Sequence, residues 1–212
     1  MASPTNTSTA PLDTVPLDAA SLDVSGALVA ISAEDASIVR AIVTALNTTA
    51  DSSLTDAALK LQEANRVFVL GAGRSGLALR MSAMRLMHLG LTVHVVGETT
   101  TPAIASGDVL LVASGSGTTS AIVRAAEIAD AAGAEIVAIT TAPDSVLGAL
   151  AAVSIIIPAA QKQDHGATLS IQYSGGLFEQ VVLLIGDAIF HTLWKASGAS
   201  AEELWPRHAN LE

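Results

Sequence analysis

Two segments rich in glycine and hydroxyl side chains hold the residues best suited to chemistry in this chain of 212 residues. Gly71-Ala-Gly-Arg-Ser-Gly76 follows the apolar run 67–70, and Ser114-Gly-Ser-Gly-Thr-Thr-Ser120 follows the apolar run 109–112 and Ala113. Glycine lets the backbone come close to an oxyanion, and hydroxyls beside the N–H groups of a helix start bind phosphate without a metal. We therefore predict one phosphate site built from both segments. Its predicted ligands are Gly73, Arg74, Ser75, Ser114, Gly115, Ser116, Gly117, Thr118 and Thr119.

Short apolar runs and helical patterns alternate around these two segments. Strands are predicted at 66–70, 91–96, 109–112, 135–139 and 153–157. Helices are predicted at 34–46, 54–64, 77–89, 122–132, 146–150 and 175–195. This alternation predicts an α/β fold, a three-layer αβα sandwich with a five-stranded parallel sheet. Ligands of such sheets bind beyond the carboxyl ends of the strands, where both segments are expected to lie.

Composition restricts the partners and the compartment. The net charge is −10, and no basic block exists that could neutralise nucleic acid or an anionic membrane. Half of the residues are hydrophobic, but we find no uninterrupted apolar run near the roughly 20 residues that span a bilayer. The chain has no cysteine, and its first residues lack the basic and apolar regions of a signal peptide. We expect a cytoplasmic protein that binds neither nucleic acid nor membrane.

The two ends of the chain differ in character. Residues 1–30 are rich in Ser, Thr, Pro, Asp and Ala without clear periodicity, which predicts a flexible leader. Residues 31–212 are expected to form one domain with two helices before the sheet and a helix and tail after it. The predicted helix 175–195 is apolar on most sides, so it must lie in a core or at a subunit interface. This favours a homo-oligomer, a dimer or a tetramer.

The first glycine segment also permits other interpretations. It matches G-x-G-x-x-G, and Glu98 follows Gly76 by 22 residues, which is the nominal pattern of a nicotinamide-dependent oxidoreductase. Gly97, however, separates the acid from the predicted strand, and the second segment has no role in that fold. A plain structural turn is the remaining alternative for the first segment.

Taken together, the motifs resemble the sugar isomerase (SIS) fold and, within it, the 6-phospho-3-hexuloisomerase family. The resemblance extends from about residue 34 to the end of the chain. One departure is Thr118, where many SIS loops have Glu. The segments that carry the resemblance are 71–76, 84–90, 96–98, 101–102, 114–117, 176–179 and 207–212.

The resemblance implies a reaction and roles for particular residues. The family interconverts D-arabino-hex-3-ulose 6-phosphate and fructose 6-phosphate in the ribulose monophosphate route of formaldehyde fixation, without metal or organic cofactor. Glu179, matched to the family's Gly-x-Phe-Glu, is the expected base, and one carboxylate can make both proton transfers of an enediolate mechanism. His208 is expected to polarise the carbonyl or move hydroxyl protons, from its own subunit or a neighbouring one. Glu98 is expected to contact a substrate hydroxyl.

A non-catalytic SIS protein that senses a sugar phosphate is the alternative within the same fold. Such regulators usually carry a helical DNA-binding domain ahead of the SIS domain. Residues 1–65 are acidic and supply only two clear helices, which is too little for that domain. The sequence therefore favours an isomerase.

Overall fold

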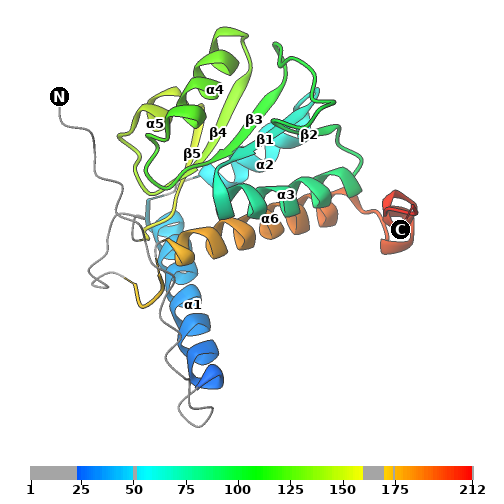
Figure 1. Ribbon diagram of the computed structural model, residues 1–212. Coiled ribbons are helices and arrows are strands. Elements are labelled where there is room, and N and C mark those ends of the chain that lie inside the picture. Colours follow the sequence, from blue (N-terminus) through cyan, green and yellow to red (C-terminus); the bar gives the residue numbers. More distant parts are fainter. Residues whose placement is uncertain (1–22, 50–51, 160–169, 174, 212) are drawn as a thin grey trace, which may run out of the picture.

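A five-stranded parallel sheet forms the centre of the protein, shown in Figure 1 as a computed structural model that describes residues 23–49, 52–159, 170–173 and 175–211. The strand order is β2-β1-β3-β4-β5. The strands are β1 (Val67–Gly71), β2 (Val93–Val95), β3 (Val109–Ala113), β4 (Glu135–Thr140) and β5 (Val153–Ile156). All five residues of β3 are buried, as expected for a central strand covered on both faces.

Helices cover both faces of this sheet. One core cluster joins α4 (Ser120–Ala131) and α5 (Val146–Leu150) to one face. The other cluster joins α1 (Val24–Thr49), α2 (Ser53–Glu63), α3 (Gly73–His88) and α6 (Gly176–Ser197) to the opposite face. The layers in Figure 1 confirm the predicted αβα sandwich.

The strand order reverses between β1 and β3, which are parallel neighbours in the sheet: β2 is added on one side of β1, and β3, β4 and β5 follow on the other. Gly71 at the end of β1 is the register partner of Ala113 at the end of β3. The two loops that follow these residues therefore leave the sheet side by side at its carboxyl edge. This is the switch point at which open α/β sheets bind ligands.

Helix α3 begins at Gly73, four residues before the predicted start, so Arg74 and Ser75 lie in its first turn instead of in a loop. A Cβ added to Gly76 would lie 2.3 Å from the carbonyl oxygen of Gly71. The first turn of α3 thus folds back onto the end of β1, and only glycine permits that approach.

Helix α1 begins at Val24, inside the leader predicted for residues 1–30, of which residues 1–22 lie outside the described residues. Asp23 Oδ1 accepts a hydrogen bond from the N–H of Gly26 at 2.8 Å, which caps the helix start. The expected boundary relied on apolar spacing and overlooked this cap. Strand β2 is likewise shorter than its predicted span of 91–96.

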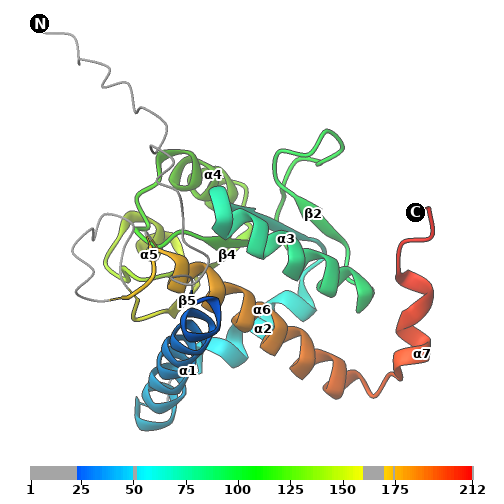
Figure 2. The ribbon, with the colours of Figure 1, turned by 60° about the horizontal axis from the view of Figure 1, so that its bottom comes forward.

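Helix α6 and the chain after it lie at one side of the molecule. By length and composition, the 22 residues of α6 could cross a membrane, contrary to the expectation that no apolar segment is that long. Ten of these residues are buried, and α6 packs along α3, so it serves as a core helix. Beyond it, α7 (Ala201–Leu204) and η2 (Trp205–Arg207) stand apart from the sheet at the far end of α6 (Figure 2).

Candidate active site

The first turn of α6 lies between the two predicted phosphate loops. Glu179 Oε2 is 3.2 Å from Nε of Arg74, which belongs to the first turn of α3. On the other side, a Cβ added to Gly115 would lie 3.8 Å from the ring of Phe178. The loops after β1 and β3 and the start of α6 therefore meet at one place, as the sequence predicted for the two loops.

Hydroxyl groups gather in the loop between β3 and α4. Ser114 Oγ lies 3.3 Å from Thr119 Oγ1. Ser116 Oγ accepts hydrogen bonds from the N–H of Thr118 at 3.3 Å and from its hydroxyl at 3.2 Å. Thr119 is the N-cap of α4, whose first N–H groups have no partner within the helix. Two pairs of hydroxyls thus lie in the loop that leads into the N-terminus of α4, a combination of groups that suits a phosphate dianion.

This loop is fastened to the neighbouring strand and helix. The carbonyl of Gly115 accepts hydrogen bonds from the hydroxyls of Thr140, at 3.1 Å, and Thr141, at 2.8 Å. Gly117 has a φ of +61°, and a Cβ added there would lie 1.9 Å from Ser145 Oγ. The loop is consequently held in one shape before any ligand binds, and glycine at 117 is required for that shape.

Glu179 and Arg74 differ greatly in exposure. The side chain of Glu179 is 4% exposed, whereas that of Arg74 is 63% exposed. Both line a groove of about 190 Å³ between α3 and α6, whose other walls include Leu77, Met81 and Leu183. A carboxylate at the base of a largely apolar groove is well placed to act on a carbon-bound proton, because little water competes for it.

Glu98 is held away from this meeting point. Its Oε1 lies 2.6 Å from Nη1 of Arg80, and both side chains are about half exposed. Arg80 follows Arg74 by six residues on α3, a rise of about 9 Å. Glu98, which was predicted to contact a substrate hydroxyl, thus forms an ion pair with Arg80 and is not brought to Glu179.

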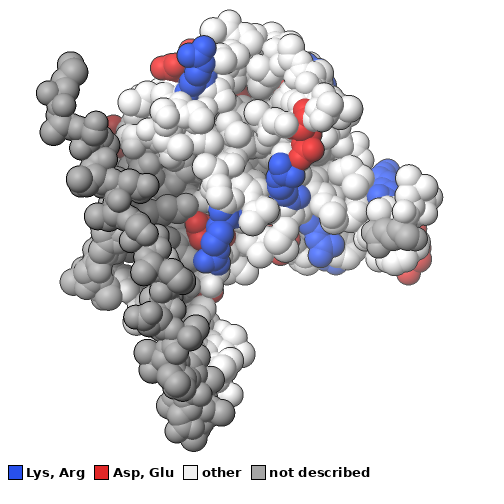
Figure 3. All heavy atoms as spheres, viewed as in Figure 1, with Lys and Arg blue, Asp and Glu red and all other residues white. Residues whose placement is uncertain are grey.

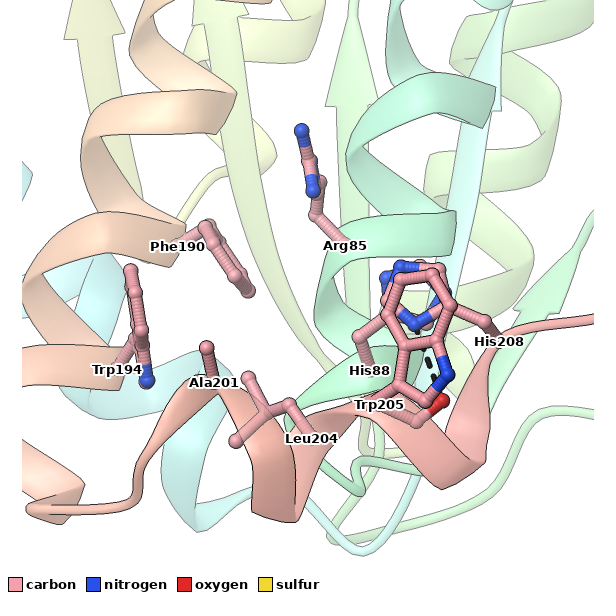
Figure 4. A pocket seen from close by; sticks show the side chains of 8 residues that line it. All are labelled: Arg85, His88, Phe190, Trp194, Ala201, Leu204, Trp205 and His208. Carbon is pink, nitrogen blue, oxygen red and sulfur yellow. Dashed lines mark hydrogen bonds between the residues drawn. The ribbon is translucent and has the colours of Figure 1, made fainter.

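His208 lies at the opposite end of α3, in a pocket of about 150 Å³ (Figure 4). Its ring stacks on that of His88 with 4.0 Å between centroids, and Arg207 donates a hydrogen bond to the carbonyl of His88 at 3.1 Å. His88 follows Arg74 by 14 residues on one helix, or about 21 Å. Within a single chain, therefore, His208 and Glu179 are not brought together.

His88 is buried. Burial lowers the pKa of His88, and the nearby His208 and Arg85 lower it further. Its Nδ1 has no hydrogen-bond partner among the described residues. The lowered pKa favours the uncharged form of His88, whose ring stacks on that of His208.

Two contributors to the site were missed by sequence reasoning. Phe178, which packs on Gly115, was visible only as part of Gly-x-Phe-Glu. Gln172 lies against the start of α6, and no sequence signal marks it. For metals, the described part of the chain holds no group of three or more His, Cys, Asp or Glu side chains able to bind an ion.

Comparison with known proteins matches residues 60–184 to the SIS domain. A relative from Mycobacterium gastri, named 3-hexulose-6-phosphate isomerase, is 63% identical over 155 residues, covering 73% of this chain and 78% of the relative. One of the same name from Bacillus subtilis (strain 168) is 41% identical, covering 70% and 80%. A crystal structure from Methanococcus jannaschii, described as inferring the function of 3-hexulose-6-phosphate isomerase, aligns with a TM-score of 0.73 and 28% identity, covering 88% and 99%.

The chain belongs to the SIS-domain family. Within that family it belongs with the 3-hexulose-6-phosphate isomerases, as the identity to the Mycobacterium gastri relative shows. The family resemblance, the α/β sandwich and the isomerase class predicted from the sequence are thereby confirmed.

Proposed function

We propose that this protein interconverts D-arabino-hex-3-ulose 6-phosphate and fructose 6-phosphate in the cytoplasm, without metal or cofactor. The observation that carries the proposal is the 3.2 Å contact between Glu179 and Arg74, made where the loops after β1 and β3 meet. This arrangement offers a phosphate cradle and a carboxylate within the reach of one six-carbon substrate. The names of the relatives support the same reaction.

The phosphate end of the substrate would be held first. Ser114, Ser116, Thr118 and Thr119 supply hydroxyl donors, and the start of α4 supplies N–H groups and the positive end of a helix dipole. Gly73 and Ser75 belong to the second helix N-terminus at the site. Arg74 adds a mobile cation, since its side chain is mostly exposed.

Proton transfer then falls to Glu179. In the direction of fructose 6-phosphate, the carboxylate removes the proton from C2, and the electron pair forms the C2=C3 bond of an enediolate while charge collects on the C3 oxygen. The proton of the C2 hydroxyl passes to the C3 oxygen, which becomes a hydroxyl, and the same carboxyl group returns its proton to C3 as the C2 carbonyl forms. The guanidinium of Arg74 can donate to a developing enediolate oxygen.

We further propose that His208 moves the hydroxyl proton in the site of a neighbouring copy. The rise of about 21 Å along α3 between Arg74, which pairs with Glu179, and His88, on which His208 stacks, supports this proposal over action in the same chain. Leu77, Met81 and Met84 form an exposed apolar stripe on α3. On the face shown in Figure 3, charged side chains lie in a few small groups that uncharged surface separates. If two copies pair along this stripe with their α3 helices antiparallel, a two-fold axis brings the His208 of each toward the Glu179 of the other. A homodimer or homotetramer follows.

A direct assay tests the reaction. The purified protein is incubated with fructose 6-phosphate in D2O and followed by NMR. We expect a second ketose phosphate to appear and deuterium to enter at C3 of fructose 6-phosphate. If no second ketose phosphate appears and C3 of fructose 6-phosphate keeps its proton, the proposed function is overturned.

A further inference from the structure

A glutamate on α1 fastens the chain segment that leads into α6. Glu34 Oε1 accepts a hydrogen bond from the N–H of Ile171 at 3.1 Å, and its Oε2 accepts one from Nε2 of Gln172 at 3.1 Å. These contacts join residues 137 and 138 positions apart in the sequence. Segment 170–173 is therefore tied to α1 through both its backbone and a side chain, close to the start of α6 (Figure 1).

The tied segment touches the residues that begin the catalytic helix. A Cβ added to Gly176 would lie 3.0 Å from Oε1 of Gln172 and 3.8 Å from Nη1 of Arg74. The N–H of Gly176 donates to the carbonyl of Tyr173 at 3.1 Å. Gln172 thus joins the carboxylate of Glu34 to the first turn of α6 at Gly176, a position that the guanidinium of Arg74 also approaches.

A hollow of about 330 Å³ lies between α1 and this segment. Its walls include Ile31 of α1, Gln172 and Gly176, and Arg74 closes it on the side of Glu179. Release of Gln172 from Glu34 would open the wall of the hollow that Gln172 forms. The start of α6 and the guanidinium of Arg74 could then shift. Because the carboxylate must meet a carbon-bound proton at close range, a displacement of about 1 Å can cost two orders of magnitude in rate.

We propose that Glu34 is a positioning residue for the isomerase reaction, acting through Gln172 on Arg74 and on the first turn of α6 that carries Glu179. This inference rests on the proposed function. The hydrogen bonds of Glu34 among the described residues go to Ile171 and Gln172, whereas the loop 114–119 is fastened by Thr140 and Thr141 of β4 and the turn after it. Its loss should consequently slow turnover more than it weakens phosphate binding.

Steady-state kinetics with fructose 6-phosphate separate these effects. For Glu34→Ala we expect kcat to fall about 10-fold to 100-fold while KM changes less than about 3-fold. Glu63→Ala, an exposed glutamate at the end of α2, is the matched control and should behave as wild type. Equal kcat values for the two variants would overturn the inference while leaving the reaction itself intact.

A reciprocal exchange tests the contact itself. In Glu34→Gln, an amide replaces the carboxylate that accepts hydrogen bonds from Ile171 and Gln172, and we expect kcat to fall. Adding Gln172→Glu in the same chain exchanges donor and acceptor, so the double variant should recover most of the lost kcat. A double variant that is no better than Glu34→Gln would contradict the specific role of this pair.

Hydrogen exchange provides a readout that does not depend on turnover. In Glu34→Ala, the amides of Ile171 and of the first turn of α6 should exchange about 10-fold faster or more, with the thermal midpoint little changed. If Glu34→Ala does not fold, Gln172→Leu tests the same contact from the partly exposed segment. Unchanged exchange at the start of α6 in the folded variant would refute the inference even if the wild type proves inactive on this substrate.

Discussion

Arg74 and Glu179 form an ion pair, 3.2 Å between Nε and Oε2, that joins the first turn of α3 to the first turn of α6. The two residues are 105 positions apart, and each belongs to a helix that begins at the carboxyl edge of the sheet. The ion pair therefore shows that the N-termini of α3 and α6, which are far apart in the sequence, lie close together in space. Every proposal for the reaction depends on that convergence.

Gly117→Ala should damage the phosphate loop. The residue has a φ of +61°, and an added Cβ would overlap Ser145 Oγ at 1.9 Å. We expect KM for fructose 6-phosphate to rise about 10-fold or more, and the free energy of unfolding to fall by about 1–3 kcal/mol from backbone strain. Steady-state kinetics and urea unfolding measure the two effects.

Gly198→Ala is the control for that variant. Gly198 has a similar φ of +69°, but nothing lies within 4 Å of an added Cβ, and it ends α6 far from the loop. It should lose comparable stability from strain alone and keep its KM. A Gly117→Ala enzyme with wild-type KM would show that the loop 114–119 does not hold the phosphate.

Asp108 should make the stability of the protein depend on pH. Burial raises the pKa of this carboxyl, but hydrogen bonds from Arg66 and the N–H of Ala105, with the charge of Arg66, outweigh burial and leave the pKa lowered. A depressed folded-state pKa adds stability above the unfolded value near 3.8, and this stability is lost as the pH falls through the folded-state value.

Asp108→Asn tests this linkage by urea unfolding. At pH 7 the variant should be less stable than wild type by about 2 kcal/mol, since it loses a charge-assisted pair with Arg66. The difference should shrink at pH 3, because the carboxyl of the unfolded wild-type chain, with its ordinary pKa near 3.8, is then largely protonated. A difference of equal size at both pH values would assign the loss to packing instead of charge.

Mixing two inactive variants tests whether sites are shared between copies. His208→Ala and Glu179→Gln should each be nearly inactive alone. After joint refolding, a mixed dimer holds one site with both intact residues, so activity should return to about a quarter of wild type for equal amounts. Each variant refolded alone, at the same total concentration, is the control, and a mixture no more active than its components would contradict the sharing of His208 between copies.

The sequence was sufficient for the sheet and for the convergence of its two loops. The apolar runs before Gly71 and Ser114 located β1 and β3, and parallel order then required both loops at one edge. The sequence predicts a loop where the first turn of α3 lies, because three glycines lower the helix propensity there. That reading missed a helix start shaped by the close approach of Gly76 to Gly71.

The sequence could not predict how close helices and loops that are far apart in the chain lie in the folded protein. The position of His208 depends on how far α3 and α6 run side by side and on how the chain turns after Gly198. The ion pair of Glu98 with Arg80 joins a turn to a helix face whose rotation no local pattern determines. The contact of Glu34 with Gln172 spans 138 positions and is made by tertiary packing alone.

The central claim is that Glu179 carries the proton between C2 and C3, and Glu179→Gln tests it most directly. The amide is close in size to the carboxylate but cannot accept the carbon-bound proton. We predict that the variant binds fructose 6-phosphate with an affinity within about 3-fold of wild type, because the loop 114–119 is unchanged, while kcat falls by about 10³-fold or more. Near wild-type turnover, or deuterium exchange at the wild-type rate, would contradict the account.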